Sequence, residues 1–158
     1  MSGDEVDALI HDYIISQEAY PSGVGFMGFP KSVCISTNNI LCHGIPNTRR
    51  FVDGDWANFD VTCYKDGFYG DTSKMMFFGE VDPLILKMSK ICQECMYIAI
   101  KLCKPGQKYE EISKAVTEHA ESNGFFVDPH FTGHGIGEFL HAAPTIMHNC
   151  NFFVFYKF

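Results

Sequence analysis

The chain has 158 residues, and its 12 basic and 19 acidic side chains leave a net charge of −7, which argues against a general binder of nucleic acid or anionic membranes. A hydrophobic fraction of 46% is ordinary for a globular protein and excludes wholesale disorder, so we expect a single domain over residues 1–158. The N-terminus is acidic where a signal peptide would be basic, and no apolar stretch is long enough to span a membrane, which predicts a soluble, intracellular protein. We expect it to be cytoplasmic and monomeric.

The first predicted element is a helix over residues 4–19, where apolar side chains recur at helical spacing and acids occupy the first turn. A loop rich in glycine, proline and aromatic residues follows over residues 20–30. Three strand-like runs and the second arm of a hairpin come next, at residues 32–37, 39–44, 56–64 and 68–79. This part of the chain therefore predicts a sheet accompanied by one helix.

Two further helices are predicted over residues 82–104 and 108–124, the second ending at the C-cap candidate Gly124. Short strands and loops follow. The order of elements predicts an α+β fold, with helices covering one face of a mainly antiparallel sheet. The aromatic-rich residues 148–158 fit either a final buried strand or a chain cut where more core should follow.

Seven cysteines at unpatterned spacings are unlike the even set of a small disulfide-rich secreted protein, which favours a reducing compartment. Cys92 and Cys95 form a CxxC within a helical pattern, but no second CxxC completes a zinc site. We expect both to be small buried hydrophobic residues.

The predicted hairpin carries one carboxylate on each arm, Asp60 and Asp71, although Asp is depleted in strands. A four-residue loop at residues 64–67 would place these two acids directly opposite each other, where like charges destabilise a sheet. Either the register is different, or a cation such as a divalent metal lies between them. A third reading is that one Asp caps the turn while the other points to water.

Three histidines lie in glycine-rich or turn contexts, His43 in CHGIP, His134 in GHGIG and His141 in FLHAAP. We expect the glycines around His134 to adopt positive φ angles and to bring the backbone close to a ligand. Two carboxylates and an imidazole would suit Co, Mn, Fe or Zn better than a structural thiolate site. The further histidines could polarise a carbonyl or move a proton, which indicates metal-assisted hydrolysis.

Four ordered blocks of this sequence resemble the signature blocks of type 1 methionine aminopeptidases. They are GFPKSVCISTNNILCHGIP, DGDWANFDVTCYKDGFYGDTSKMMFFG, KPGQKYEEI and GHGIGEFLHAAP, and the resemblance extends from about Val6 to His148. It implies the pita-bread fold of the M24 peptidases, a curved antiparallel sheet backed by helices with pseudo-twofold halves. It also implies an enzyme that removes the initiator methionine from nascent proteins at the ribosome, without binding nucleic acid directly.

The resemblance also implies a role for each candidate metal ligand. Asp60 would hold one of two divalent ions with both oxygens, Asp71 would bridge the two ions, and His134 would bind the other. The identity of the ions, among Co, Mn, Fe and Zn, is left open. The two acids would then share one hairpin because cations lie between them.

The substrate residues implied by the resemblance are His141, which would contact the developing oxyanion, and His43, near the leaving side of the scissile bond. The side-chain pocket for methionine would be lined by Phe26, Phe29 and Cys34. A small apolar volume suits an unbranched thioether.

One departure from the family affects the expected activity. The family has two further metal-binding glutamates beyond the HxxP segment, whereas no residue from 144 to 158 is acidic. We therefore expect a C-terminally truncated domain with an incomplete second half, weak metal binding and impaired activity. The alternative is a pita-bread module that binds partners without hydrolysis.

Overall fold

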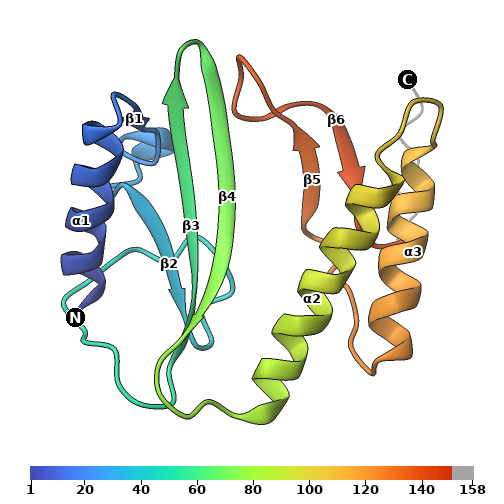
Figure 1. The fold of residues 1–158 in the computed structure, drawn as a ribbon, viewed down its shortest axis with the longest axis horizontal. Helices are drawn as coiled ribbons and strands as arrows, with labels where there is room; N and C mark the ends of the chain where they lie inside the picture. Colours follow the sequence, from blue (N-terminus) through green and yellow to red (C-terminus); the bar gives the residue numbers. More distant parts are fainter. Residues whose placement is uncertain (151–158) are drawn as a thin grey trace. The chain divides into compact units, whose positions relative to one another are not determined.

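The structure, a computed structural model, describes residues 1–150 and divides the chain into two units. The first unit contains Met1–Asp82 together with Ile136–Leu140, and the second contains Pro83–Gly135 and the residues from His141 onward. Figure 1 shows the helices and strands of each unit. The predicted role of the aromatic tail falls on residues 151–158, which lie outside the described part. The single domain over residues 1–158 stays a prediction.

Helix α1 (Gly3–Ser16) of the first unit begins at a capping box. The Ser2 backbone N–H donates to a Glu5 carboxylate oxygen at 2.7 Å, and the Glu5 N–H donates to the Ser2 hydroxyl at 3.3 Å. The buried Asp7 then ties α1 to the next strand, since its Oδ1 accepts the N–H groups of Ser32 at 2.7 Å and Val33 at 3.1 Å. The acids of this predicted helix therefore stabilise both its start and its docking.

The antiparallel sheet of the first unit is organised around a long strand, β3 (Trp56–Lys65). Strand β4 (Phe68–Phe77) pairs with β3 along its whole length, while β2 (Val33–Thr37) and the short β1 (Tyr20–Pro21) pair with different parts of it. One face of the sheet packs against α1 to form a hydrophobic core. The sheet contributes Val33, Ile35, Ala57, Phe59 and Val61, and α1 contributes Val6 and Ile10. Because side chains alternate along a strand, the intervening residues lie on the opposite face.

The predicted strand at residues 39–44 does not form. Gly44 instead lies against β2, where its carbonyl accepts the Ile35 N–H at 2.8 Å. A Cβ atom at Gly44 would lie 2.2 Å from the Ile35 carbonyl oxygen, so only glycine fits there. Asn38 and His43 have left-handed backbones, with φ of 55° and 52°, which interrupt an extended strand.

The second unit contains α2 (Pro83–Leu102), α3 (Tyr109–Ser122) and a two-stranded sheet of β5 (Thr132–Gly135) and β6 (Ala142–Met147). The two helices bury a core formed by Ile91, Cys95, Ile112, Val116 and Ala120. The C-cap of α3 is Asn123, and the predicted C-cap residue Gly124 comes directly after it with φ of 84°. Within the described residues, none of the helices combines the length and apolar content needed to cross a membrane.

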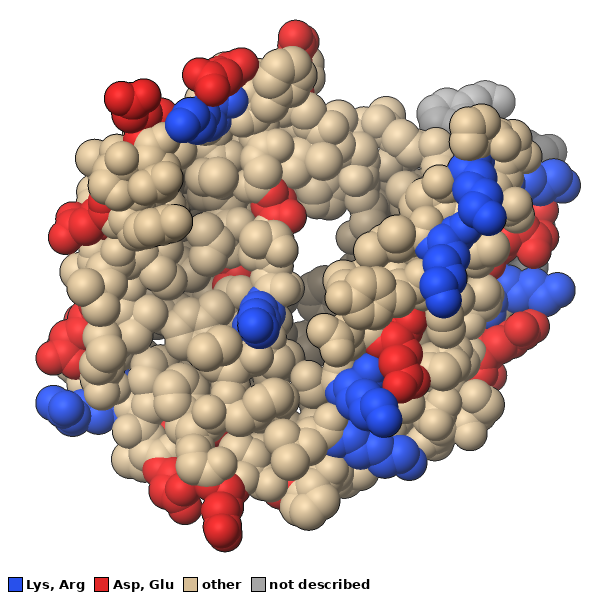
Figure 2. Space-filling view, viewed as in Figure 1, with Lys and Arg blue, Asp and Glu red and all other residues tan. Residues whose placement is uncertain are grey.

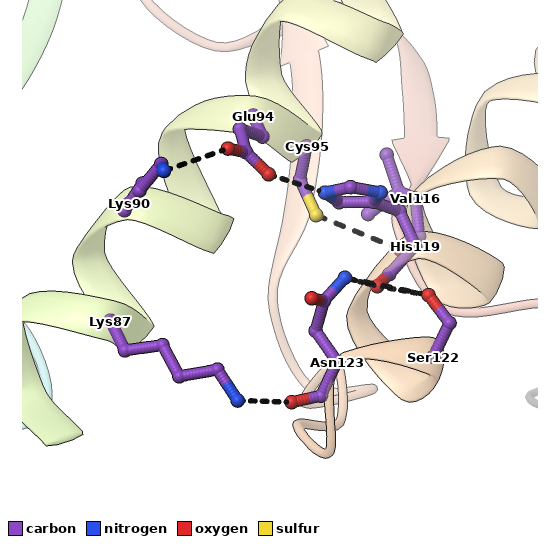
Figure 3. Close-up of polar contacts among 8 residues, drawn as sticks. All are labelled: Lys87, Lys90, Glu94, Cys95, Val116, His119, Ser122 and Asn123. Carbon is purple, nitrogen blue, oxygen red and sulfur yellow. Dashed lines mark hydrogen bonds and ion pairs between the residues drawn. The ribbon is translucent and has the colours of Figure 1, made fainter.

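Polar contacts join α2 to α3 beside this core (Figure 3). The Glu94 carboxylate lies 2.8 Å from His119 Nε2 and 4.0 Å from Lys90, and Lys87 Nζ donates to the Asn123 carbonyl at 3.1 Å. On the face in Figure 2, basic side chains lie mainly over these helices with acidic ones between them. Hydrogen bonds therefore supplement the apolar contact between the helices.

The two cysteines of the CxxC differ in exposure. Cys95 is buried, and its thiol lies 3.7 Å from the Val116 carbonyl oxygen. Cys92 is exposed and lines an open apolar cavity of about 470 Å³ in this unit, so the prediction that both are buried was wrong for Cys92. Neighbours three apart on a helix point in directions about 60° apart, and the α3 contact covers only one of them.

Candidate metal centre

The β3–β4 hairpin turns through two residues, Asp66 and Gly67, whose φ angles are 51° and 92°. Positive φ at both central residues is typical of the type I′ turn that suits a tight hairpin. Lys65 pairs with Phe68, and the predicted four-residue loop is therefore wrong.

This register moves the two acids out of direct opposition. Asp60 pairs with Ser73, and Thr62 pairs with Asp71. Because Asp60 and Thr62 are two residues apart, Asp60 and Asp71 still lie on the same face as diagonal neighbours. The predicted direct pairing was wrong by two residues, but the predicted proximity of the carboxylates was right.

The electrostatics of this pair suit a divalent cation. Burial and, next, the neighbouring Asp71 carboxyl raise the pKa of the Asp60 carboxyl to about 6, while His43 acts in the opposite direction. Ionising both acids is therefore costly until a positive charge offsets their repulsion. Carboxylate oxygens are the donors that hard and borderline divalent ions accept.

Two predicted substrate residues belong to the same unit. Cys34 on β2 pairs with Asp60 in the sheet register, and burial raises the pKa of its thiol to about 11, so it remains neutral. His43 is exposed and influences the Asp60 pKa, which places it within electrostatic range of that carboxyl. Its left-handed backbone, with φ of 52°, is uncommon for a non-glycine residue.

Phe26 and Phe29 lie on a tight turn between β1 and β2. Phe26 begins the 3₁₀ helix η1 (Phe26–Gly28), and Phe29 is the residue that follows it. The Gly25 N–H donates to the Phe29 carbonyl at 2.8 Å, which closes the loop. Their predicted place in a methionine pocket stays a prediction.

His134 and His141 belong to the second unit, where their ring centroids lie 4.5 Å apart in an edge-to-face arrangement. Nδ1 of His134 lies 2.9 Å from the Gly135 carbonyl oxygen. A carbonyl can only accept, so Nδ1 donates the hydrogen, and in the neutral ring Nε2 is then the nitrogen with the lone pair. Metal-binding histidines typically donate their other ring N–H in this way, so His134 suits the predicted role.

The glycines around His134 serve close packing. The expected positive φ angles are wrong, because Gly133 and Gly135 belong to β5 and neither they nor Gly137 has positive φ. A Cβ atom on Gly135 would lie 2.3 Å from the Ala143 carbonyl oxygen. This approach coincides with the irregular pairing between His134 and Gly135.

Replacing Gly135 with Ala is expected to destabilise the chain by about 1–3 kcal/mol, because the new methyl group overlaps backbone that cannot move aside. Urea unfolding would measure the loss. Gly137→Ala is the matched control, since a Cβ there meets no atom within 4 Å. Equal stability of the two variants would contradict the close approach as the reason for glycine.

The predicted site residues fall on both units. Asp60, Asp71, His43 and Cys34 belong to the first, and His134 and His141 belong to the second. Among the residues that the structure describes, no three His, Cys, Asp or Glu side chains form a group able to hold a metal ion. The meeting of His134 with the two acids stays a prediction.

Thr62 was not among the predicted site residues, although its hydroxyl donates to Asp71 Oδ1 at 3.1 Å. The signal was present in the sequence, because Asp-Gly flanked by alternating apolar residues is a strong indicator of a two-residue hairpin loop. That loop places Thr62 opposite Asp71.

Comparison with known proteins agrees with the family resemblance seen in the sequence. The family model described as metallopeptidase family M24 matches residues 1–153. The chain is 47% identical over 151 residues to the mitochondrial methionine aminopeptidase 1D of Homo sapiens, covering 96% of this chain and 45% of that protein. It is 43% identical to the methionine aminopeptidase of Escherichia coli (strain K12), covering 94% of this chain and 57% of that protein.

A solved structure, the methionine aminopeptidase from Rickettsia prowazekii, superimposes with a TM-score of 0.92 at 37% identity, covering 94% of this chain and 60% of that one. The predicted α+β, pita-bread fold is therefore confirmed. The chain spans about half the length of the human and bacterial relatives, 45% and 57% respectively.

Proposed function

The chain belongs to metallopeptidase family M24, and from this membership we propose that it provides the function of a methionine aminopeptidase. The reaction is hydrolysis of the first peptide bond of proteins that begin with methionine. The names of the similar human and bacterial proteins support this substrate class.

The proposed metal ligands are Asp60, Asp71 and His134. One observation carries their joint role: the Tyr69 N–H donates to the Gly137 carbonyl at 2.8 Å, which attaches residues 136–140 to β4 two residues before Asp71. Gly137 and His134 are three residues apart, so their Cα atoms are separated by at most about 11 Å. This short connection supports the proposal that His134 joins the acidic pair.

Divalent ions, which we propose to be Co, Mn, Fe or Zn, supply an activated water and polarise the scissile carbonyl when bound. His141 is proposed to donate a hydrogen bond to the oxygen on which negative charge develops, and His43 to act near the leaving amine. The neutral Cys34 thiol, with Phe26 and Phe29, would provide an apolar lining for the methionine side chain.

The proposed substrates are nascent polypeptides with an N-terminal methionine. The proposed compartment is the cytoplasm, where thiols remain reduced. The absence of disulfides among the cysteines of residues 1–150 is compatible with that compartment.

The test follows free methionine released from Met-Ala-Ser by the purified chain, with Mn(II) or Co(II) and with a chelator. Slow, metal-dependent release is expected, in line with the predicted weak metal binding and impaired activity. N-acetylated Met-Ala-Ser, which lacks a free amine, should not be cleaved. His141→Ala should lower kcat while metal content, measured by elemental analysis, stays nearly unchanged.

Calorimetric titration of Met-Ala-Ser into the metal-loaded chain separates the remaining outcomes. Metal-dependent binding without release would favour the binding-module alternative. Neither binding nor release would contradict the proposal, and a His141→Ala variant that loses its metal would reassign that residue as a ligand.

A further inference from the structure

The sheet face that carries the two acids also carries neutral hydrogen-bond donors at fixed positions. Thr62 pairs directly with Asp71 across β3 and β4, and its hydroxyl lies 3.1 Å from Asp71 Oδ1. One step beyond Asp60 in the other direction, Asn58 Nδ2 donates to the Ser73 hydroxyl at 3.4 Å. The Asp60–Asp71 diagonal therefore has neutral polar side chains on both sides, Thr62 on one and the hydrogen-bonded Asn58 and Ser73 on the other.

The hydroxyl of Thr62 has a specific effect on its neighbour. An Asp carboxylate on an exposed strand position can rotate about its last torsion, which is broad and weakly restricted. A donor bound to Oδ1 restricts that rotation and so defines where Oδ2 points. The direction of the threonine hydroxyl is itself constrained, because a β-branched side chain has few χ1 rotamers.

The lack of charge on the Thr62 side chain matters as much as its position. A Lys or Arg at position 62 would neutralise Asp71 and compete with a bound cation, whereas a hydroxyl orients the carboxylate and leaves its charge in place. Groups that hold a metal ligand in orientation typically contribute about 10–100-fold to metal affinity or activity. The location and chemistry of Thr62 match that requirement.

We infer that Thr62 is a positioning residue that orients the Asp71 carboxylate for a divalent cation through its hydroxyl. This inference rests on the proposed function, in which Asp71 is a metal ligand. Thr62 does not touch the ion or the substrate. It acts through Asp71 alone.

The test measures the dissociation constant for Mn(II) alone, by calorimetric titration of the chain. T62S and T62A form the decisive pair, because both remove the γ-methyl group and they differ only in the hydroxyl. We expect T62A to raise the Mn(II) Kd by about 10–100-fold relative to T62S. T62V, which keeps the branched shape without the hydroxyl, should behave as T62A does.

T72V is the matched control, since Thr72 pairs with Val61 on the opposite face of the same hairpin. It should bind Mn(II) as the unaltered chain does. The melting temperature of each variant without metal shows whether Thr62 has a merely structural role. If T62A and T62S differ in melting temperature but have the same Kd, the inference is overturned.

The remaining outcomes are equally decisive. Equal Mn(II) affinity of T62A, T62V and T62S, with measurable binding by the unaltered chain, would overturn the role of Thr62 and leave the proposed function standing. Failure of the unaltered chain to bind Mn(II) would overturn the proposed metal site, and this inference with it. Should T62V fail to fold, the T62A and T62S comparison still decides.

Discussion

Asp60→Asn is expected to lower the affinity of the chain for Mn(II) or Co(II) by more than about 100-fold, a larger effect than that of a residue acting through a ligand. The substitution keeps the size of the side chain but removes one of two carboxylates on the same sheet face. An amide oxygen carries no net charge to offset that of the ion. Calorimetric titration with each metal measures the change.

The same substitution is expected to raise the stability of the metal-free chain at neutral pH. Asp60 is half-buried and lies close to Asp71, so ionised Asp60 opposes folding until a cation binds. Removing that charge should raise the melting temperature while abolishing metal binding. A site that sacrifices stability for function behaves in this way.

Asp66→Asn provides the matched control. Asp66 lies in the turn of the same hairpin with φ of 51°, a conformation that Asn also tolerates, and the net charge changes by the same amount. It should leave metal affinity and stability nearly unchanged. Equal loss of affinity in both variants would show that overall charge, and not the acidic pair, attracts the metal.

Asp55→Asn is expected to destabilise the chain by about 2–4 kcal/mol, because it removes the negative charge at the centre of a hydrogen-bond network around a buried side chain. Asp55 is 4% exposed, and its two oxygens lie 2.8 and 2.9 Å from the Arg49 guanidinium. It also accepts from Asn38 Nδ2 at 2.8 Å and from the Val52 N–H at 2.9 Å. Urea unfolding at pH 7 measures the loss.

The effect should depend on pH. The Arg49 guanidinium and the other donors hold the pKa of the Asp55 carboxyl well below its usual range. Its contribution is therefore complete above the unfolded pKa of about 4 and is lost as pH falls toward the folded value. The difference in stability between the native chain and Asp55→Asn should shrink below about pH 4.

Asp12→Asn is the control for this pair of measurements, since Asp12 is exposed on α1. It should change the free energy of unfolding by no more than about 0.5 kcal/mol. A difference between native and Asp55→Asn chains that stays constant from pH 7 to pH 3 would contradict the ion pair as its source.

Much of the local structure could be predicted because local signals determine it. The helix at α1 begins at a capping box, α2 begins with Pro83, and Gly124 follows α3 in a left-handed conformation. The alternation of side chains along β3 and β4 likewise placed Asp60 and Asp71 on one face even with the register misjudged by two residues.

What the sequence by itself determined is thus the set of helices, the acidic hairpin and the family to which they belong. The tertiary structure alone decided where backbone segments from distant parts of the chain approach one another. Gly44 lies against Ile35, so residues 39–44 form no strand. Gly135 lies against Ala143, so glycine is required there because it has no side chain. Asp55 was indistinguishable from a surface acid until folding buried it beside Arg49. Periodicity and turn residues report local geometry, whereas burial and close approach depend on contacts between segments that no short stretch of sequence contains.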